Sequence, residues 1–333
     1  MTMKTLRGKV VPLIIAVAAS AAGLYFATKN VHWGELKNIL ASATLTPLLY
    51  AAAMTAITFT LRGLRWKILL SPFHDAPLFA LVRWQIGGVF INNILPFRAG
   101  ELVRAFWAGH KTSIPKSTVF ATIVMERLCD LGSIAVIGSV VATVLGLGNF
   151  LSRQNLLIGG VLLAAAAAGV KFFFSSYGPD KLFALFRKHL PEKLCHFIEK
   201  FSSGLRVVQS KKEVAKLIAL SFAIWALDIS AVMFVSQCLD LHLTWLKSAM
   251  VMVGLILGVM VPAAPGAAGT FEAGGVAALA LFGIGKTLAF SFVLLLHAFQ
   301  YVMVMAMGIP ILMSEGFHLK TLKEAEKEAA SEI

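Results

Sequence analysis

The sequence predicts an all-α polytopic membrane protein, with about six spanning helices and two re-entrant helical hairpins that form an inverted repeat. Of its 333 residues, 58% are hydrophobic and only 14% are charged, and the mean hydropathy is +0.80. Soluble domains carry about 25% charged residues, so this composition excludes a soluble globule. A second observation is a series of apolar runs close to the roughly 20 residues that a spanning helix needs. A third is that two of these runs are interrupted by proline, glycine and charged residues.

The net charge of +13 is explained by basic loops on the cytoplasmic side of a membrane, where Lys and Arg accumulate. We expect no nucleic-acid partner, because no basic run alternates with aromatic residues in a soluble module. Cys129, Cys195 and Cys238 are far apart and lack the spacing of a metal or redox site. We interpret them as packing residues.

The first span is predicted at 10–26, after basic residues at positions 4, 7 and 9. A cleaved signal peptide would have the same pattern, but the apolar remainder of the chain favours a permanent anchor that starts in the cytoplasm. The second span, 46–61, is followed by Arg62 and Arg65, which place its end in the cytoplasm. Both arginines are either anchors of this kind or collect anionic headgroups at a cytoplasmic entrance.

An interrupted segment follows at 79–110, with basic residues on both sides of it. A hairpin that enters and leaves the membrane from the cytoplasm explains these charges, and two complete spans would explain them as well. Further spans are predicted at 117–147 and 156–170.

The second half of the chain begins with a basic cytoplasmic loop at 171–216. Its apolar residues between 194 and 205 recur at helical spacing, which indicates an amphipathic helix on the inner leaflet or a cap packed on the bundle. Spans at 217–239 and 288–312 enclose a second interrupted segment at 249–282. The charged tail, 314–333, is interpreted as a cytoplasmic helix.

The two interrupted segments have matching spacings. Glu126 follows Glu101 by 25 positions, and His297 follows Glu272 by 25 positions. The predicted directions of the two halves are opposite, which makes them inverted copies, although chance spacing in a glycine-rich membrane protein is the alternative. Interrupted apolar segments at matching places in two halves indicate a transporter's binding site. The domain is predicted as one unit, 1–333, with a first repeat at 46–147, a linking part at 148–213, a second repeat at 214–312 and a tail at 313–333.

Irregular backbone cannot face lipid, because each unpaired N–H or C=O group costs several kcal/mol there. The first break, marked by Pro96 and Gly100, and the second break, marked by prolines 262 and 265 and glycines 266 and 269, must therefore line a cavity inside the protein. Helices that begin at such breaks point partial positive charge and free N–H groups into the cavity. The sequence thus predicts an anion site between the two hairpins.

Charged and polar residues at bilayer depth are the candidates for this site, because they are costly there unless they pair or face a cavity. Arg98 and Arg104 would hold a phosphate with Glu101 orienting them, or would form a structural ion pair with it. Glu126 and Asp130 share a helix face and repel, so one is protonated or pairs with an arginine. The candidate substrate-binding residues are Arg62, Arg65, Asn92, Asn93, Arg98, Glu101, Arg104, Glu126, Arg127, Asp130, Asp228, Glu272 and His297. His297 either titrates near neutral pH or is a satisfied buried histidine.

Four stretches together resemble the transmembrane, flippase-like domain of the lysylphosphatidylglycerol synthase family. They are RGLRWK (62–67), NNILPFRAGELVR (92–104), MERLCD (125–130) and VPAAPGAAGTFEAG (261–274). The sequence has PGAAG where relatives often have a double glycine after the proline. The resemblance implies lipid translocation between leaflets by a stand-alone unit, without the aminoacyl-transfer domain of full-length members.

We therefore expect a protein that moves a lipid between leaflets through a polar cavity, the lipid being an anionic or zwitterionic phospholipid or a polyprenyl- or hopanoid-type lipid. The alternatives are a membrane-embedded transferase acting on a lipid phosphate, and a scaffold for an envelope-lipid enzyme. The chain has no G-x-x-x-x-G-K-[ST] motif, so we expect transport that is downhill, coupled to protons or driven by the membrane potential. We expect no cofactor. Membrane lipids are the expected partners, and a homo-oligomer or an envelope-lipid biosynthetic enzyme is compatible with the sequence. The predicted location is the inner membrane, with both termini in the cytoplasm.

Overall fold

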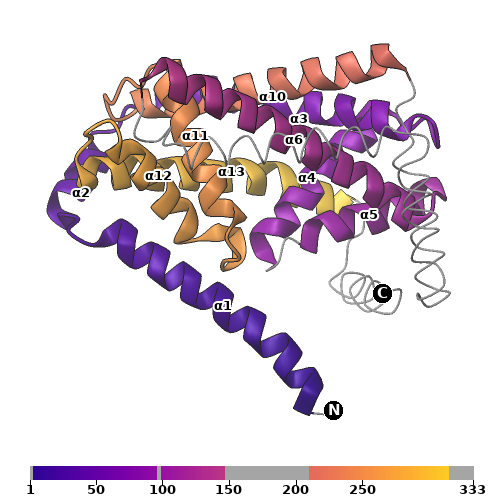
Figure 1. Cartoon of the computed structure of the whole chain (residues 1–333), viewed down its shortest axis with the longest axis horizontal. Coiled ribbons are helices and arrows are strands. Elements are labelled where there is room, and N and C mark those ends of the chain that lie inside the picture. Colours follow the sequence, from indigo (N-terminus) through magenta and orange to yellow (C-terminus); the bar gives the residue numbers. More distant parts are fainter. Residues whose placement is uncertain (1–2, 96–98, 147–209, 315–333) are drawn as a thin grey trace. The chain divides into compact units, whose positions relative to one another are not determined.

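The computed structural model describes residues 3–95, 99–146 and 210–314 (Figure 1). Within these ranges the regular elements are helices, which confirms the predicted all-α class. They are α1 (Met3–Thr28), α2 (Trp33–Ala41), α3 (Thr46–Leu70), α4 (Leu78–Ile94), α5 (Ala99–Thr112), α6 (Lys116–Val144), α10 (Lys211–Gln237), α11 (Trp245–Met260), the 3-10 helix η3 (Pro265–Ala267), α12 (Thr270–Ala280) and α13 (Lys286–Ser314).

Four of the described helices are long and apolar enough to cross a membrane, namely α3, α6, α10 and α13. A fifth crossing results if Ile14–Thr28 of α1 and Trp33–Ala41, which meet at 83°, are counted as one bent span. These helices coincide with predicted spans, and the chain is accordingly a multi-pass membrane protein. The span predicted at 156–170, the amphipathic helix between 194 and 205 and the tail from 315 lie outside the described residues, so the count of six spans stays a prediction.

The helix α3 extends beyond its predicted end. It continues through Arg62 and Arg65 to Leu70, because Trp66, Leu69 and Leu70 are buried in a hydrophobic core and keep this part of the helix packed. Arg65 consequently lies inside the protein.

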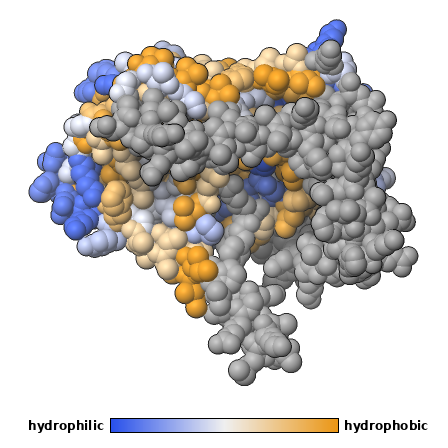
Figure 2. All heavy atoms as spheres, viewed as in Figure 1, coloured by the Kyte–Doolittle hydropathy of each residue, from blue (hydrophilic) through white to orange (hydrophobic). Residues whose placement is uncertain are grey.

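Apolar side chains are exposed on the long helices, and the apolar areas of the surface are seen in Figure 2. Leu49 of α3, Val140 of α6 and Val302 of α13 are each more than half exposed. A soluble protein rarely exposes so many large apolar side chains, whereas acyl chains are a suitable environment for them.

The contacts divide the chain into two compact units, which are described separately. The first comprises Met1–Thr55, Asn92–Arg98 and Leu227–Met305, and it contains α11, η3 and α12. The second comprises Ala56–Ile91, Ala99–Ala226 and Ala306–Ile333, and it contains α5, α6 and most of α4.

Besides α2 and η3, four of the described helices are too short to span a bilayer alone. The helices α4, α5, α11 and α12 have 17, 14, 16 and 11 residues. At about 1.5 Å per residue, each is shorter than a hydrocarbon core of roughly 30 Å. These lengths agree with the two predicted hairpins, whose re-entrant path remains a prediction.

The helices α11 and α12 approach each other closely through glycines. A Cβ at Gly254 would lie 2.6 Å from the carbonyl oxygen of Gly274, and a Cβ at Gly258 would meet the carbonyl oxygen of Thr270. Gly254 and Gly258 form the G-x-x-x-G spacing that lets helix backbones touch inside membranes. The helix α1 also comes close at the start of α12, since a Cβ at Gly23 would lie 2.6 Å from the carbonyl oxygen of Gly269, the residue that precedes α12. Small residues on both neighbours thus fix the position of α12.

Candidate functional site

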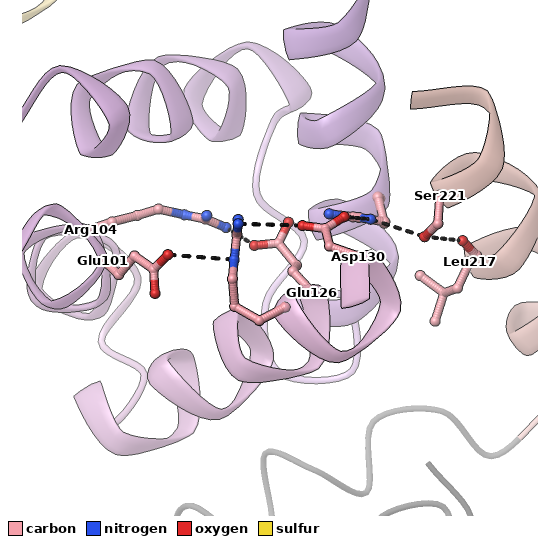
Figure 3. A network of polar contacts seen from close by, with 8 residues as sticks. Glu101, Arg104, Glu126, Asp130, Leu217 and Ser221 are labelled. Carbon is pink, nitrogen blue, oxygen red and sulfur yellow. Dashed lines mark hydrogen bonds and ion pairs between the residues drawn. The ribbon is translucent and has the colours of Figure 1, made fainter. Parts of the chain in front are cut away.

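The second unit contains a buried network of ion pairs, which Figure 3 shows. Arg65 of α3 is fully buried, and its Nη1 donates hydrogen bonds to Asp130 Oδ1 at 2.7 Å and to Ser221 Oγ at 2.9 Å. Asp130 lies on α6 and Ser221 on α10, so one guanidinium group joins three helices. A charged side chain is stable at such a place only with partners of this kind.

A second arginine, Arg104 of α5, forms an ion pair with Glu126 of α6. The side chain of Glu126 is fully buried and that of Arg104 is nearly so. The guanidinium carbon of Arg104 lies 3.7 Å from the centre of the Trp66 ring, which places the cation over an aromatic face. Trp66 in turn donates a hydrogen bond from Nε1 to Thr122 Oγ1 at 3.0 Å. The pair is therefore held between α3, α5 and α6.

The third arginine, Arg127, connects the network to the surface. Its Nε lies 3.5 Å from Glu101 Oε1, and its Nη1 lies 3.4 Å from Asp130 Oδ2. The side chains of Arg127 and Glu101 are 34% and 25% exposed, whereas Asp130 is buried. The network thus runs from a partly exposed end at Glu101 to a sealed end at Arg65.

In the ion pairs of this network three arginines meet three carboxylates, and Arg62 also acts electrostatically on Asp130. The hydrogen bonding is incomplete, however. Among the described residues, Arg65 Nε and Nη2, Arg104 Nε and Glu126 Oε1 are buried and have no hydrogen-bond partner. Buried polar groups are nearly always satisfied, so these atoms are suited to a group that offers both acceptors and donors.

The first unit contains a different polar cluster, at the second break. His297 of α13 and Glu272 of α12 lie with Nδ1 and Oε1 2.5 Å apart. The other carboxylate oxygen of Glu272 accepts a hydrogen bond from Gly269 N–H at 2.6 Å, and His297 Nε2 lies 3.1 Å from the carbonyl oxygen of Gly266. The ring of Phe271 stacks on His297 with centroids 4.3 Å apart. One histidine–glutamate pair therefore organises the whole turn from 266 to 272.

This cluster changes the expectation of a free anion site at the start of α12. The carboxylate of Glu272 already receives the N–H of Gly269, the residue that precedes α12. A carboxylate at this place is stabilised by the helix dipole as well as by the hydrogen bond. The negative group at this helix start belongs to the chain itself.

Of the remaining candidates, Arg62 acts electrostatically on Asp130, and the others are not members of the ion pairs described above. Arg98 lies outside the described residues. Asn92 and Asn93, at the end of α4, are half-buried, and the carbonyl oxygen of Asn93 accepts a long hydrogen bond of 3.5 Å from the hydroxyl of Tyr301. Arg62 and Asp228 are half-buried and each has an interaction with a partner.

The pairing of Asp130 with Arg127 is one of the alternatives that the sequence suggested, whereas the pairing of Glu101 and Arg104 differs from the expectation. Glu101 and Arg104 share α5 but pair separately, with Arg127 and Glu126. Asp130 pairs with Arg65 and Arg127, so both carboxylates on α6 have arginine partners. Trp66 lies in the stretch RGLRWK that carries the family resemblance, but no local pattern indicates a contact with Arg104, and none singles out Ser221 or Tyr301. The spacing of Gly254 and Gly258, in contrast, is a G-x-x-x-G motif that is visible in the sequence.

Comparisons with known proteins identify related membrane proteins. A membrane protein of the UPF0104 group from Methanothermobacter thermautotrophicus is 24% identical over 320 residues, which cover 89% of this chain and 92% of the relative. The UPF0104 membrane protein MJ1595 from Methanocaldococcus jannaschii is 24% identical over 73% of this chain and 77% of its own length. A protein named glycosyltransferase AglD, from Haloferax volcanii, is 24% identical over 96% of this chain, which spans only 57% of that relative. The family model described as the lysylphosphatidylglycerol synthase TM region matches residues 13–308, and the chain belongs to this family.

Proposed function

We propose that this protein moves a lipid between the two leaflets of its membrane, and that the ion-pair network of the second unit receives the headgroup. The observation that carries the proposal is a network of ion pairs that contains buried donors and a buried acceptor without hydrogen-bond partners among the described residues, and that reaches the surface at Glu101 and Arg127. The membership in the lysylphosphatidylglycerol synthase TM region family supports a role in lipid or glycan processing.

The network suits transient binding of a headgroup, because the charges of the headgroup can replace the ionic partners that the side chains have within the protein. A phosphate that reaches Arg127 competes with Glu101, whose carboxylate is released toward any ammonium or hydroxyl group of the same headgroup. Asp130 lies next in line, since it contacts both Arg127 and Arg65. A headgroup can thus replace one ionic partner after another without leaving a charge unpaired at depth, where this would cost several kcal/mol.

The predicted repeat gains support from contacts within each unit. In the second unit, the acid near the start of α5, Glu101, pairs with Arg127 on the following long helix. In the first unit, the acid near the start of α12, Glu272, pairs with His297 on the following long helix. We propose on this basis that α4–α5 and α11–α12 are equivalent hairpins of an inverted repeat.

Lipid movement is tested with purified protein in vesicles that contain fluorescent phosphatidylglycerol or phosphatidylethanolamine, whose outer-leaflet fraction is quenched chemically. The wild-type protein is expected to move at least one analogue faster than protein-free vesicles do. Arg127→Gln should reduce this rate by about tenfold or more, because it removes the partly exposed cation that meets the headgroup.

The matched controls are Lys37→Gln and Glu35→Gln, two exposed positions on α2, which should keep the wild-type rate. A wild-type rate equal to that of empty vesicles, or an Arg127→Gln rate equal to that of Lys37→Gln, contradicts the proposal. The relation to a protein named glycosyltransferase AglD makes a membrane-embedded transferase the second candidate. Formation of a glycosylated lipid from a sugar-phosphate donor, without lipid movement, would favour it.

A further inference from the structure

We propose that Glu272 and His297 form a proton-binding site whose occupancy holds the second break in its turn conformation, and that this site links lipid movement to protons. The linkage to lipid movement rests on the proposed function. The proton site itself rests on the geometry of the first unit alone.

The count of protons follows from the two hydrogen bonds of His297. The carbonyl oxygen of Gly266 can only accept a hydrogen bond, so Nε2, 3.1 Å away, must carry a proton. A further proton must lie between Nδ1 and Glu272 Oε1, which are 2.5 Å apart. With both protons present, the pair is an imidazolium with a carboxylate or an imidazole with a carboxylic acid, and its total charge is zero.

Loss of one proton breaks this arrangement. The neutral imidazole then has one N–H, which it donates to the carboxylate of Glu272. Nε2 becomes an acceptor, and it faces the acceptor oxygen of Gly266. The pair also acquires a net negative charge at a buried position, which is unfavourable.

The turn at Gly266 depends on this hydrogen bond, because its backbone is unusual. Gly266, Ala267 and Gly269 have φ values of +68°, +58° and +90°. The left-handed region is unfavourable for alanine, so the conformation of Ala267 must be held by its surroundings. When Nε2 no longer donates to Gly266, we expect the turn to open.

Among the described residues, no positively charged side chain faces the pair and could replace the lost proton. From α12 the pair meets the Phe271 ring, and from α13 the phenol ring of Tyr301, with centroids 5.1 Å from His297. The α1 segment Ile14–Thr28 has no Asp, Glu, Lys, Arg or His, and it contributes the hydroxyl of Ser20, which accepts a hydrogen bond from Ala264 N–H at 2.8 Å. The single charged residue of α11, Lys247, lies over the ring of Phe282.

Tyr301 extends this site to the first break. Its hydroxyl group occupies the space that a Cβ on Gly266 would need, and it donates a hydrogen bond to the carbonyl oxygen of Asn93. Tyr301 therefore touches the turn of the second break and the end of α4 at the same time. When the pair loses its proton and the turn opens, Tyr301 loses the surface against which it packs. Loss of the proton is therefore expected to affect the first break as well.

The proton site is tested by hydrogen exchange of the full-length protein in nanodiscs, from about pH 5 to about pH 9, after correction for intrinsic exchange rates. Amides of 262–273 should be protected at the acidic end and on the order of tenfold less protected at the alkaline end. His297→Gln and Glu272→Gln should each abolish this pH dependence, whereas His74→Gln, at an exposed histidine, should keep it. Tyr301→Phe should keep it at 262–273 but lose any parallel change at 91–95.

Wild-type protection of 262–273 that does not change with pH overturns the proton site, and so does a pH dependence that persists in both Glu272→Gln and His297→Gln. The linkage is tested in vesicles with an imposed pH gradient, which should change the wild-type rate of lipid movement several-fold and leave the Glu272→Gln rate unchanged. Lipid movement that ignores the gradient in the wild type overturns the linkage and leaves the proposed function intact. Vesicles in which no lipid moves overturn the proposed function and with it the linkage, and hydrogen exchange then decides the proton site independently.

Discussion

Arg104→Met should destabilise the protein by about 3–5 kcal/mol, because it leaves the buried carboxylate of Glu126 without its partner. Both side chains are almost completely buried, and the guanidinium group also covers the Trp66 ring. Glu126→Leu should have a loss of similar size, since it leaves the cation of Arg104 unpaired. The Arg104→Met/Glu126→Leu double variant should recover most of the lost stability, because it removes both charges and fills the space with apolar groups.

Equilibrium unfolding in mixed micelles measures this double-mutant cycle. The control is Lys67→Met, whose partner Asp75 is mostly exposed, and it should change the free energy of unfolding by about 1 kcal/mol or less. If the double variant is as unstable as the sum of the single variants, the two side chains do not act as a pair. A stable double variant is also informative for function, because it should fold normally and move lipid poorly.

The helices were predictable because long apolar runs have few alternatives in a bilayer. The predicted spans at 46–61, 117–147, 217–239 and 288–312 are all found as helices. The predicted span ends at 61 because Arg62 and Arg65 follow its apolar run, whereas the burial of Trp66 and Leu69 continues α3 to Leu70. A basic cluster after an apolar run does not reveal by itself whether its side chains are exposed or buried.

Apart from Arg127 and Asp130, which are three positions apart on α6, the pairing of the charges is not predictable from local spacing. Arg65 forms hydrogen bonds with Asp130 and Ser221, which are 65 and 156 positions away in the sequence. Only the packing of α3, α6 and α10 brings these residues together. Neighbours in sequence, such as Glu101 and Arg104, turn to different partners on α6. Glu272 and His297, in contrast, were both singled out by the matching spacing of the two halves, and they are in contact.

Gly254→Val should prevent the normal packing of α11 on α12 and should destabilise the protein by about 3 kcal/mol. The first side-chain carbon would lie 2.6 Å from the carbonyl oxygen of Gly274 and 2.7 Å from the Cβ of Ala278. The backbone oxygen cannot move aside without displacing α12, so the helices must separate. The control is Gly132→Val in α6, where nothing lies within 4 Å of the added carbon and the substitution should be tolerated.

Thermal unfolding of both variants in nanodiscs measures the difference in stability, and hydrogen exchange measures its effect on the second break. Glu272 is held by α12, so a displaced α12 should move its carboxylate away from His297 although both side chains are still present. Gly254→Val should therefore lose the pH-dependent protection of 262–273, and Gly132→Val should retain it. Equal stability and equal protection in the two variants would contradict the close glycine packing of α11 and α12, and with it the argument that this packing positions the proton-binding pair.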